Sequence, residues 1–550
     1  MSRAAALSSD PYDVVVIGAG HNGLVAAAYL ARAGLRVIVL ERRDLIGGAC
    51  VTEELWPGFK VSTASYVCSL LRPRIVRELE LRRHGLELLP RNPSSFSPFP
   101  DGRYLMLGPD RDLNRREIAK FSSRDADALP HYEAMLERVA DFIEPTLEMT
   151  PPDPWSLRPR DLYALARLGW RFLRLGRRDG ARAIEVLTGS ARAILDRWFE
   201  SEELKATLAT DAVIGAFAAP SMPGTAYVLF HHVMGECNSA RGVWCYVRGG
   251  MGGISQALAA AARAHGAEIR TGAPVARIAV REGKAAGVVL EDGSEIEARQ
   301  VVSNADAHVT FLRLLDPRQL PAGFGDAVRA IDYASPSLKI NLALSALPVF
   351  AALPGAAPGP QHRGTIHVAP SLDYIERAFD DAKYGRPSRQ PILECTIPSV
   401  VDPTVAPSGR HLMSVFVQYA PYRLAEGTWD DAREAFADRC LDVLAEYAPN
   451  MRGAVVARQV LAPPDLEERF ALTGGNIFQG AMTLGQLFFL RPVPGYADYR
   501  APIAGLYLCG AATHPGGGVM GACGFNAARE MLRDAPRFRA KAGARAGRRT

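Results

Sequence analysis

Runs of apolar residues that alternate with helix-like segments give this chain its clearest pattern. Val14–Ile17 is unbroken and β-branched, which is typical of a strand buried on both faces of a parallel sheet. The following positions predict a helix over 22–33 and a second strand over 36–40. A short buried strand at 506–509, with a helix after it, closes the chain. Strand–helix units of an α/β fold are therefore predicted at both ends.

A second segment of the chain, which starts near residue 249, is predicted to belong to the same α/β domain. Ile254–Ala264 is predicted to be a helix. A meander of short strands and a return to the main sheet follow, at 275–280, 285–290, 294–298 and 300–303. The glycines at 249, 250, 252 and 253 are not predicted to form a second dinucleotide motif, because no buried parallel strand leads into them.

The remaining segments mix helical and strand-like patterns and are predicted to form a substrate domain of α+β type. Helices are expected at 126–149 and 430–447, and strands at 338–343 and 411–419. Phe217, Tyr227 and Phe230 could line a pocket there, although packing in the core is the ordinary role of such aromatics. The predicted domains are a discontinuous dinucleotide-binding domain (1–65, 241–310, 481–536) and an inserted substrate domain (66–240, 311–480).

The N-terminal strand–helix unit carries a G-x-G-x-x-G sequence. Gly18 suits the tight turn, Gly20 lets a diphosphate approach, and Gly23 lets the helix pack closely on the strand. Ala19 and Asn22 complete the predicted loop. Backbone N–H groups at the start of the helix would bind a diphosphate.

An acidic residue closes the second strand. Glu41 lies near the position at which a carboxylate binds a ribose hydroxyl and disfavours a 2′-phosphate. Arg42 is expected beside the nucleotide, although Arg42 and Arg43 could also indicate NADP. A glycine pair ends at Gly48, as is frequent near the diphosphate of glutathione-reductase-type FAD proteins. Ala49 stands where many of them have Arg or Ser. Backbone groups near Val275 are candidate partners for the adenine.

The C-terminal glycine-rich unit distinguishes FAD from NAD. A helix that starts beside an isoalloxazine ring can direct N–H groups at its pyrimidine edge, and NAD enzymes need no such element. The residues predicted to serve here are Gly510, Ala511, Val519 and Met520. The fold class predicted is α/β, with a glutathione-reductase-type Rossmann-like FAD domain, and the cofactor predicted is FAD.

Composition limits the kinds of partner, metal site and cellular location that we expect for this protein. The chain has 550 residues, 48% of them apolar, and a formal net charge of +5, which gives no case for a nucleic-acid partner. Eight cysteines include no C-x-x-C pair and no zinc-like spacing, so neither a metal site nor disulfide exchange is expected. The first residues do not resemble a signal peptide, and residues 537–550 are predicted to be a disordered basic tail. We expect a bacterial, cytoplasmic protein.

One segment suggests contact with a membrane surface. Within 160–178, five arginines recur at spacings of seven, four, three and four, on one face of a predicted helix (Arg160, Arg167, Arg171, Arg174 and Arg178). Such a helix could lie on an acidic lipid surface, at the inner membrane, or pack on its own domain.

Candidate chemistry follows from a flavin beside an apolar pocket. We expect hydride transfer from an apolar, isoprenoid-like substrate to the flavin, and reoxidation by oxygen or a quinone, since no nicotinamide site is evident. His514, in the loop before the flavin-facing helix, is the first candidate for a catalytic group, and His232 or its neighbour His231 is the second. A carotenoid ketolase or oxygenase and a non-catalytic binder of lipid or prenyl groups remain alternatives.

The two glycine-rich units, together with 201–235 and 474–495, resemble the phytoene-desaturase-related flavoproteins, from about residue 12 to residue 533. Within this group the chain is similar to the pyridine nucleotide-disulphide oxidoreductase domain-containing protein 2 family, and carotenoid ketolases are more distant. The resemblance implies a glutathione-reductase-like FAD fold with a split substrate domain. It also implies an oxidoreductase, which in animals belongs to the mitochondrial matrix. The disulphide chemistry in the family name has no paired cysteines to support it here.

Overall fold

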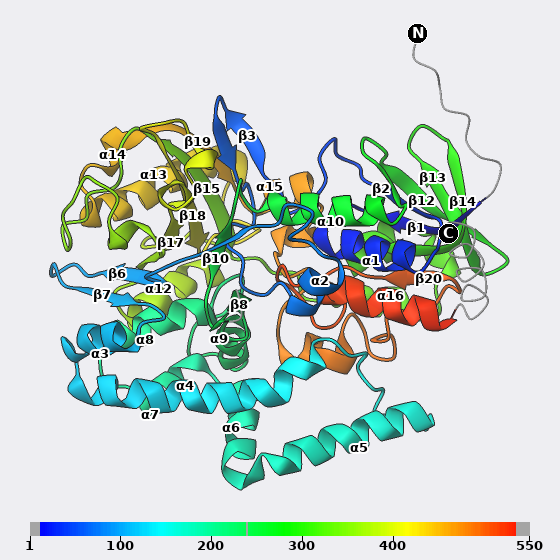
Figure 1. Cartoon of the computed structure of the whole chain (residues 1–550), viewed down its shortest axis with the longest axis horizontal. Helices are drawn as coiled ribbons and strands as arrows, with labels where there is room; N and C mark the ends of the chain where they lie inside the picture. Colours follow the sequence, from blue (N-terminus) through cyan, green and yellow to red (C-terminus); the bar gives the residue numbers. More distant parts are fainter. Residues whose placement is uncertain (1–10, 238–239, 535–550) are drawn as a thin grey trace.

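The computed structural model describes residues 11–237 and 240–534, and two seven-stranded sheets organise them (Figure 1). The first sheet has the order β11-β2-β1-β14-β13-β12, and β20 pairs with β14. β1, β2, β11 and β20 run parallel to one another or to β14, as expected for a dinucleotide-binding domain. The strands are β1 (Tyr12–Ile17), β2 (Val37–Leu40), β11 (Glu268–Arg270), β12 (Val275–Arg281), β13 (Lys284–Leu290), β14 (Glu295–Ser303) and β20 (Leu506–Leu508).

Three helices pack beside the first sheet, and they come from distant parts of the chain. They are α1 (His21–Arg32), α10 (Gly252–Ala264) and α16 (Ala522–Asp534). Figure 1 shows α1 and α16, in blue and red, side by side near the sheet. Small residues along α1, such as Ala26 and Ala27, are fully buried and let the helices approach closely. The predicted α/β fold class is confirmed.

One predicted pair of strands is a single strand. The sequence predicts a meander strand at 294–298 and a separate return at 300–303, whereas β14 runs unbroken over Glu295–Ser303. Its first half pairs antiparallel with β13, and its second half pairs parallel with β1 and β20. Gln300, the first residue of the predicted return, is buried within the strand.

The second sheet carries apolar side chains on one face and most of its buried polar side chains on the other. Its order is β19-β15-β18-β17-β16-β6-β7. Ile340 and Val415 lie in the core on the face of α13 (Trp429–Tyr447), whereas the residues between them along the strands point to the opposite face. The strands are β6 (Ser95–Pro98), β7 (Tyr104–Leu107), β15 (Ser337–Leu344), β16 (Thr365–Val368), β17 (Ile392–Thr396), β18 (His411–Gln418) and β19 (Val455–Leu461).

The remaining helices pack beside the second sheet, beside the first sheet, or along the lower edge of the molecule (Figure 1). The helix expected at 126–149 ends earlier, as α4 (Ser123–Ile143) followed by one 3₁₀ turn at Glu144–Thr146. The others are α2 (Pro73–Glu78), α3 (Arg111–Ala119), α5 (Pro159–Arg174), α6 (Gly176–Thr188), α7 (Ala191–Trp198), α8 (Glu202–Ala209), α9 (Thr225–Val233), α11 (Phe324–Arg329), α12 (Leu372–Lys383), α14 (Met451–Ala454) and α15 (Pro463–Phe470). Short two-stranded pairs complete the fold: β3 (Glu53–Trp56) with β4 (Phe59–Val61), β5 (Leu88–Pro90) with β10 (Cys245–Val247), and β8 (Glu236–Cys237) with β9 (Ala240–Arg241).

The amphipathic helix predicted at 160–178 is interrupted. α5 ends at Arg174, and Gly176, with φ of 72°, turns the chain into α6. Arg178 therefore belongs to a different helix from the other four arginines of the predicted stripe. In the described part of the chain, no helix is both long and apolar enough to cross a bilayer.

The predicted domain boundary at residue 310 cuts through a buried cluster. Phe311, Leu314 and Phe324, assigned to the substrate domain, pack with Val301 and Leu506 of the first sheet. The boundaries stay predictions, as does the disordered tail at 537–550, which lies outside the described residues.

Candidate functional site

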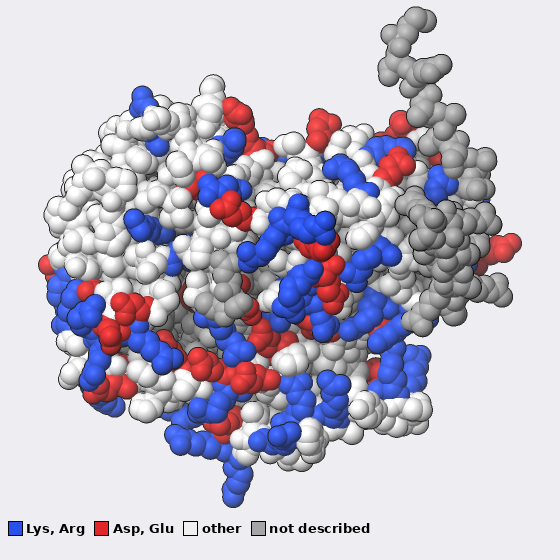
Figure 2. Space-filling model, in the orientation of Figure 1, with Lys and Arg blue, Asp and Glu red and all other residues white. Residues whose placement is uncertain are grey.

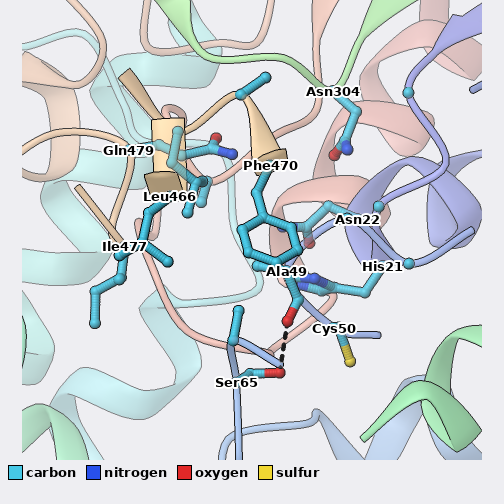
Figure 3. Close-up of a pocket in the computed structure, with 18 of the residues that line it drawn as sticks. His21, Asn22, Ala49, Cys50, Ser65, Asn304, Leu466, Phe470, Ile477 and Gln479 are labelled. Atoms are coloured by element: carbon cyan, nitrogen blue, oxygen red, sulfur yellow. Dashed lines mark hydrogen bonds between the residues drawn. The ribbon is translucent and has the colours of Figure 1, made fainter. Parts of the chain in front are cut away.

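A cavity of about 430 Å³ extends from the first sheet to the second. Its wall begins at Gly18 and Glu41, continues past Ala511 and Val519, and ends at the second sheet with Phe416. Cavities of this size and mixed lining hold small molecules and cofactors. Figure 3 shows His21, Asn22 and Asn304 on one side of the cavity, Leu466, Ile477 and Gln479 on the other, and the Phe470 ring projecting between them.

The glycines of the N-terminal loop keep one side of this cavity open. A side chain at Gly20 would lie 2.5 Å from Asn304 Nδ2, and one at Gly23 would lie 2.3 Å from the carbonyl oxygen of Gly18. Gly18 itself has φ of 89°, which favours glycine. His21, at the start of α1, lines the cavity, and its Nε2 is buried without a partner among the described residues. The loop therefore fits a dinucleotide diphosphate bound through backbone N–H groups.

Glu41 lies at the carboxyl end of β2, on the cavity wall. Its Oε2 accepts a hydrogen bond of 2.8 Å from Ala19 N, and its Oε1 accepts one of 3.0 Å from Arg43 N. The carboxylate is thereby held in place with lone pairs left for ribose hydroxyls. Arg42 donates to the Glu468 carbonyl, and Arg43 pairs with Glu53. Both cations already have partners in the protein, which favours a ribose without a 2′-phosphate.

The two ends of the chain meet at the contact of α1 and α16. Gly524 packs so closely that a Cβ there would lie 2.0 Å from the carbonyl oxygen of Asn22. Tyr29 and Phe525 form an edge-to-face ring contact at 5.1 Å on the same interface. This contact places the loop at Ala511 and the residue Val519 on the same cavity as the N-terminal loop.

A buried arginine holds the C-terminal loop against its neighbours. The Arg491 guanidinium donates to the carbonyl oxygens of six residues, including Ala511 and Phe478, at 2.7 to 3.3 Å. Among the described residues it forms no ion pair with a carboxylate. It joins segment 478–486 to the loop that lines the cavity.

We expect Arg491→Lys to destabilise the protein by about 3 kcal/mol or more, because an ammonium has three donors and cannot reach six carbonyls. The apparent unfolding temperature of the purified protein checks this. Arg389→Lys, at a side chain that is 85% exposed, is the control and should change nothing measurable. An unchanged unfolding temperature in Arg491→Lys would show that the carbonyl contacts contribute little.

Four residues form one row across the polar face of the second sheet. Lys339 of β15 lies opposite Phe416 of β18, which in turn lies opposite Glu394 of β17. His367 of β16 lies opposite Glu394. Residues in register on neighbouring strands point to the same face, so these side chains form a continuous line.

Tyr66, in the loop after β4, covers this row. Its ring stacks on Phe416 with centroids 5.8 Å apart, and its hydroxyl donates to Glu394 Oε1 at 2.8 Å. Lys339 Nζ lies 4.1 Å from the centre of the Tyr66 ring and contacts Ser414 Oγ. Tyr66, Lys339 and Phe416 all line the cavity.

Burial dominates the electrostatics of this row. It lowers the pKa of Lys339 to about 7, so the amine is neutral in part at neutral pH. Burial, with a contribution from Asp211, raises the pKa of Glu394 to about 7. Lys339 and Glu394, at the end of the cavity away from the dinucleotide loop, can therefore take up and release protons near neutral pH.

Most of the predicted site residues line this one cavity. They are Gly18, Gly20, Asn22, Glu41, Arg42, Gly48, Ala49, Val275, Ala511, Val519 and His232. Ala49 takes part through its carbonyl, which accepts a hydrogen bond of 2.9 Å from Ser65 Oγ (Figure 3). Residues of the predicted set behind the wall are Ala19, Gly23, Gly510, Met520 and His514. The binding roles of both groups stay predictions.

The three candidate histidines differ in placement. His514 Nε2 lies 2.7 Å from the carbonyl oxygen of Thr146, and its ring contacts Phe488 rather than the cavity. Burial lowers its pKa to about 4. His232 lines the cavity and stacks on Trp244, and its Nδ1 lies 2.8 Å from the carbonyl oxygen of Val228. Of His514, His231 and His232, only His232 lines the cavity, so a catalytic role for His514 or His231 gains no support from its position.

A glycine-lined cavity that fits a dinucleotide and continues to a second sheet is typical of the glutathione-reductase-like class of nucleotide-binding folds. The chain belongs to the family described as flavin containing amine oxidoreductase, which residues 23–532 match. A flavin is the cofactor that this family implies, and the cavity residues fit its dinucleotide part.

Individual relatives agree with this assignment. The chain is 50% identical to pyridine nucleotide-disulfide oxidoreductase domain-containing protein 2 of Rattus norvegicus, over 95% of this chain and 94% of the relative, and the predicted resemblance is confirmed. It is 28% identical to a neurosporene-forming phytoene desaturase of Rhodobacter capsulatus, over 95% and 94%. Cyclohexylamine oxidase from Brevibacterium oxydans has a similar fold, with a TM-score of 0.55, 16% identity, and coverage of 97% and 99%.

Proposed function

We propose that the protein is an FAD-dependent dehydrogenase of a neutral, apolar substrate of isoprenoid type, with oxygen or a quinone as the electron acceptor. The observation that carries the proposal is the lining of the cavity beyond Ala511. Ile214, Trp244, Phe416 and Phe478 form apolar walls there. The carboxylates in the described wall are Glu41 and Glu291, both at the dinucleotide end.

That distribution of charge disfavours an amine substrate. A cationic amine would meet Lys339, which is protonated in part near neutral pH, and no exposed carboxylate, because Glu394 lies behind Tyr66 and accepts a hydrogen bond from its hydroxyl. An apolar molecule instead gains from burial against aromatic walls. The relationship to a phytoene desaturase supports the same substrate class.

The chemistry divides between cofactor and protein. A bound flavin supplies hydride acceptance. Removing a hydride and a proton from adjacent carbons leaves a carbon–carbon double bond, and the proton needs a base. Lys339 Nζ, with a pKa of about 7, can take that proton in its neutral form. Tyr66 and Phe416 position the substrate above Lys339 and exclude water.

The first test is whether the purified protein has the colour of a bound flavin. We expect the purified protein to be yellow and to release FAD on denaturation, identified by mass. Anaerobic addition of phytoene in detergent should bleach the flavin absorption, and cyclohexylamine should leave it unchanged. Bleaching by cyclohexylamine but not by phytoene would overturn the substrate class, and a colourless protein that takes up no FAD would favour a non-catalytic binder. A product one oxygen atom heavier under air would indicate a ketolase or oxygenase instead.

A further inference from the structure

α5 presents an apolar face that no described part of the chain covers. Leu162, Ala166, Trp170 and Leu173 recur at helical spacing, with Tyr163 beside them, and all are exposed. Leu173 is 76% exposed, Tyr163 69% and Trp170 57%. Asp161 is the single buried residue of the helix. Large apolar side chains gathered on one exposed face mark an interaction surface.

A stripe of arginines runs beside this apolar face. Arg160, Arg167, Arg171 and Arg174 recur at spacings of seven, four and three along the helix. Arg167 forms no ion pair with any carboxylate among residues 11–237 and 240–534. Arg174 instead lies 4.7 Å from the centre of the Trp170 ring. The basic stripe therefore borders the apolar one.

A third side of α5 attaches it to the protein. Phe172 contacts Phe142 of α4 at 5.7 Å, and Arg171 donates to the Phe142 carbonyl. Figure 1 shows α5 as an arm along the lower edge of the molecule, away from both sheets. The exposed apolar face is thus held in a fixed orientation by the opposite side of the same helix.

The charge of this region exceeds that of the whole protein. Residues 155–184 contain eight arginines and two aspartates, a formal charge of +6 against +5 for the entire chain. Figure 2 shows blue side chains along the lower edge, where α5 and α6 lie, with uncharged surface between them. A second copy of the chain would bring like charges together at this face, whereas an anionic surface complements it.

We propose that α5 binds in the plane of an anionic lipid bilayer, with Leu162, Trp170 and Leu173 inserted among the acyl chains and the arginines on the phosphates. Aromatic residues suit the interface, and arginine reaches phosphates from the border of an apolar face. Trp155, which is 69% exposed and precedes α5, extends the apolar surface and contacts Phe489. This docking does not depend on the substrate or on the proposed reaction.

Vesicle flotation of the full-length, flavin-loaded protein tests the proposal. We expect it to float with phosphatidylcholine vesicles that contain phosphatidylglycerol, and to float poorly with phosphatidylcholine alone or at high salt. Two variants each should lower the bound fraction at least about tenfold: Arg167→Glu with Arg174→Glu, and Tyr163→Ser with Leu173→Ser. Brominated lipid should quench the tryptophan fluorescence of the wild type, and the quenched fraction should fall in Trp170→Phe.

Control variants outside α5 show whether the loss of vesicle binding is specific to this helix. Tyr384→Ser with Val456→Ser removes exposed apolar groups elsewhere, and Arg389→Glu reverses an exposed charge elsewhere, so both should bind like the wild type. Flavin content reports that each variant is folded. A wild type that does not float with anionic vesicles would overturn the proposal. So would binding that survives both α5 variants and depends on residues 537–550, or a dimer in solution that Tyr163→Ser with Leu173→Ser dissociates.

Discussion

Lys339→Met is expected to lower the rate of anaerobic flavin reduction by substrate at least about 100-fold while the protein keeps its flavin. The variant removes the amine that we propose as the base, and this amine belongs to β15 of the second sheet and not to the glycine-rich loops. In the wild type the rate should rise with pH through about 7, because the neutral amine is the active form. That rise should be absent from the variant.

The same substitution should stabilise the protein. In the unfolded chain a lysine keeps its proton up to pH about 10.4. In the folded protein burial lowers the pKa of Lys339 to about 7. Between these values the unfolded state binds a proton that the folded state lacks, so stability rises with pH, and the penalty is greatest at pH 7 and below. Methionine removes the penalty, and the gain in unfolding temperature should shrink towards pH 10.

Lys205→Met provides the matched control, since Lys205 is also buried but lies outside the cavity. Ion pairs with Asp196 and Glu202 raise its pKa against the opposing effect of burial. Its stabilising contribution is present below the unfolded pKa, so this variant should lose stability at pH 7 and keep its reduction rate. If Lys339→Met reduced its flavin at the wild-type rate at pH 7, Lys339 would not be the base.

Gly524→Ala is expected to leave the purified protein with less than about a tenth of its flavin. The new methyl group would lie 2.0 Å from the carbonyl oxygen of Asn22, and backbone cannot yield there without moving α16 away from α1. The shift separates Val519 from the N-terminal loop, and both line the cofactor cavity.

Absorbance of the released flavin per protein measures this effect, and far-ultraviolet circular dichroism reports whether the fold persists. Gly453→Ala is the matched control, because Gly453 lies in helix α14 with nothing within 4 Å of a new Cβ. It should keep full flavin. A Gly524→Ala protein with wild-type flavin content and unfolding temperature would contradict the close contact between the two helices.

The sequence predicted the N-terminal loop of the cavity because the glycine spacing is a local signal. Gly18, Gly20 and Gly23 are set by one strand, one turn and one helix, and Glu41 follows at the end of the next strand. The structure places Gly18, Gly20 and Glu41 on one cavity wall with Ala511, and Gly23 directly behind it.

The row at the second sheet could not be predicted in the same way. Lys339, Glu394 and His367 are brought together by the pairing of four strands that are far apart in sequence. A single lysine inside the apolar strand Ser337–Leu344 was the available signal, since a buried ammonium needs a reason. Tyr66 lies in a loop without a periodic pattern, and no sequence signal indicated it. For His514 the sequence indicated the loop but not the direction of the side chain, whose ring lies against the carbonyl group of Thr146.

The contact between α1 and α16 also affects how the protein acquires its cofactor during synthesis. The first helix leaves the ribosome some five hundred residues before its packing partner. With the cofactor bound as proposed above, the N-terminal loop alone would hold only the adenosine end of the nucleotide until the last helix emerges. A nascent chain stalled shortly before residue 522 should therefore hold FAD weakly, and stable loading should coincide with release of the finished polypeptide.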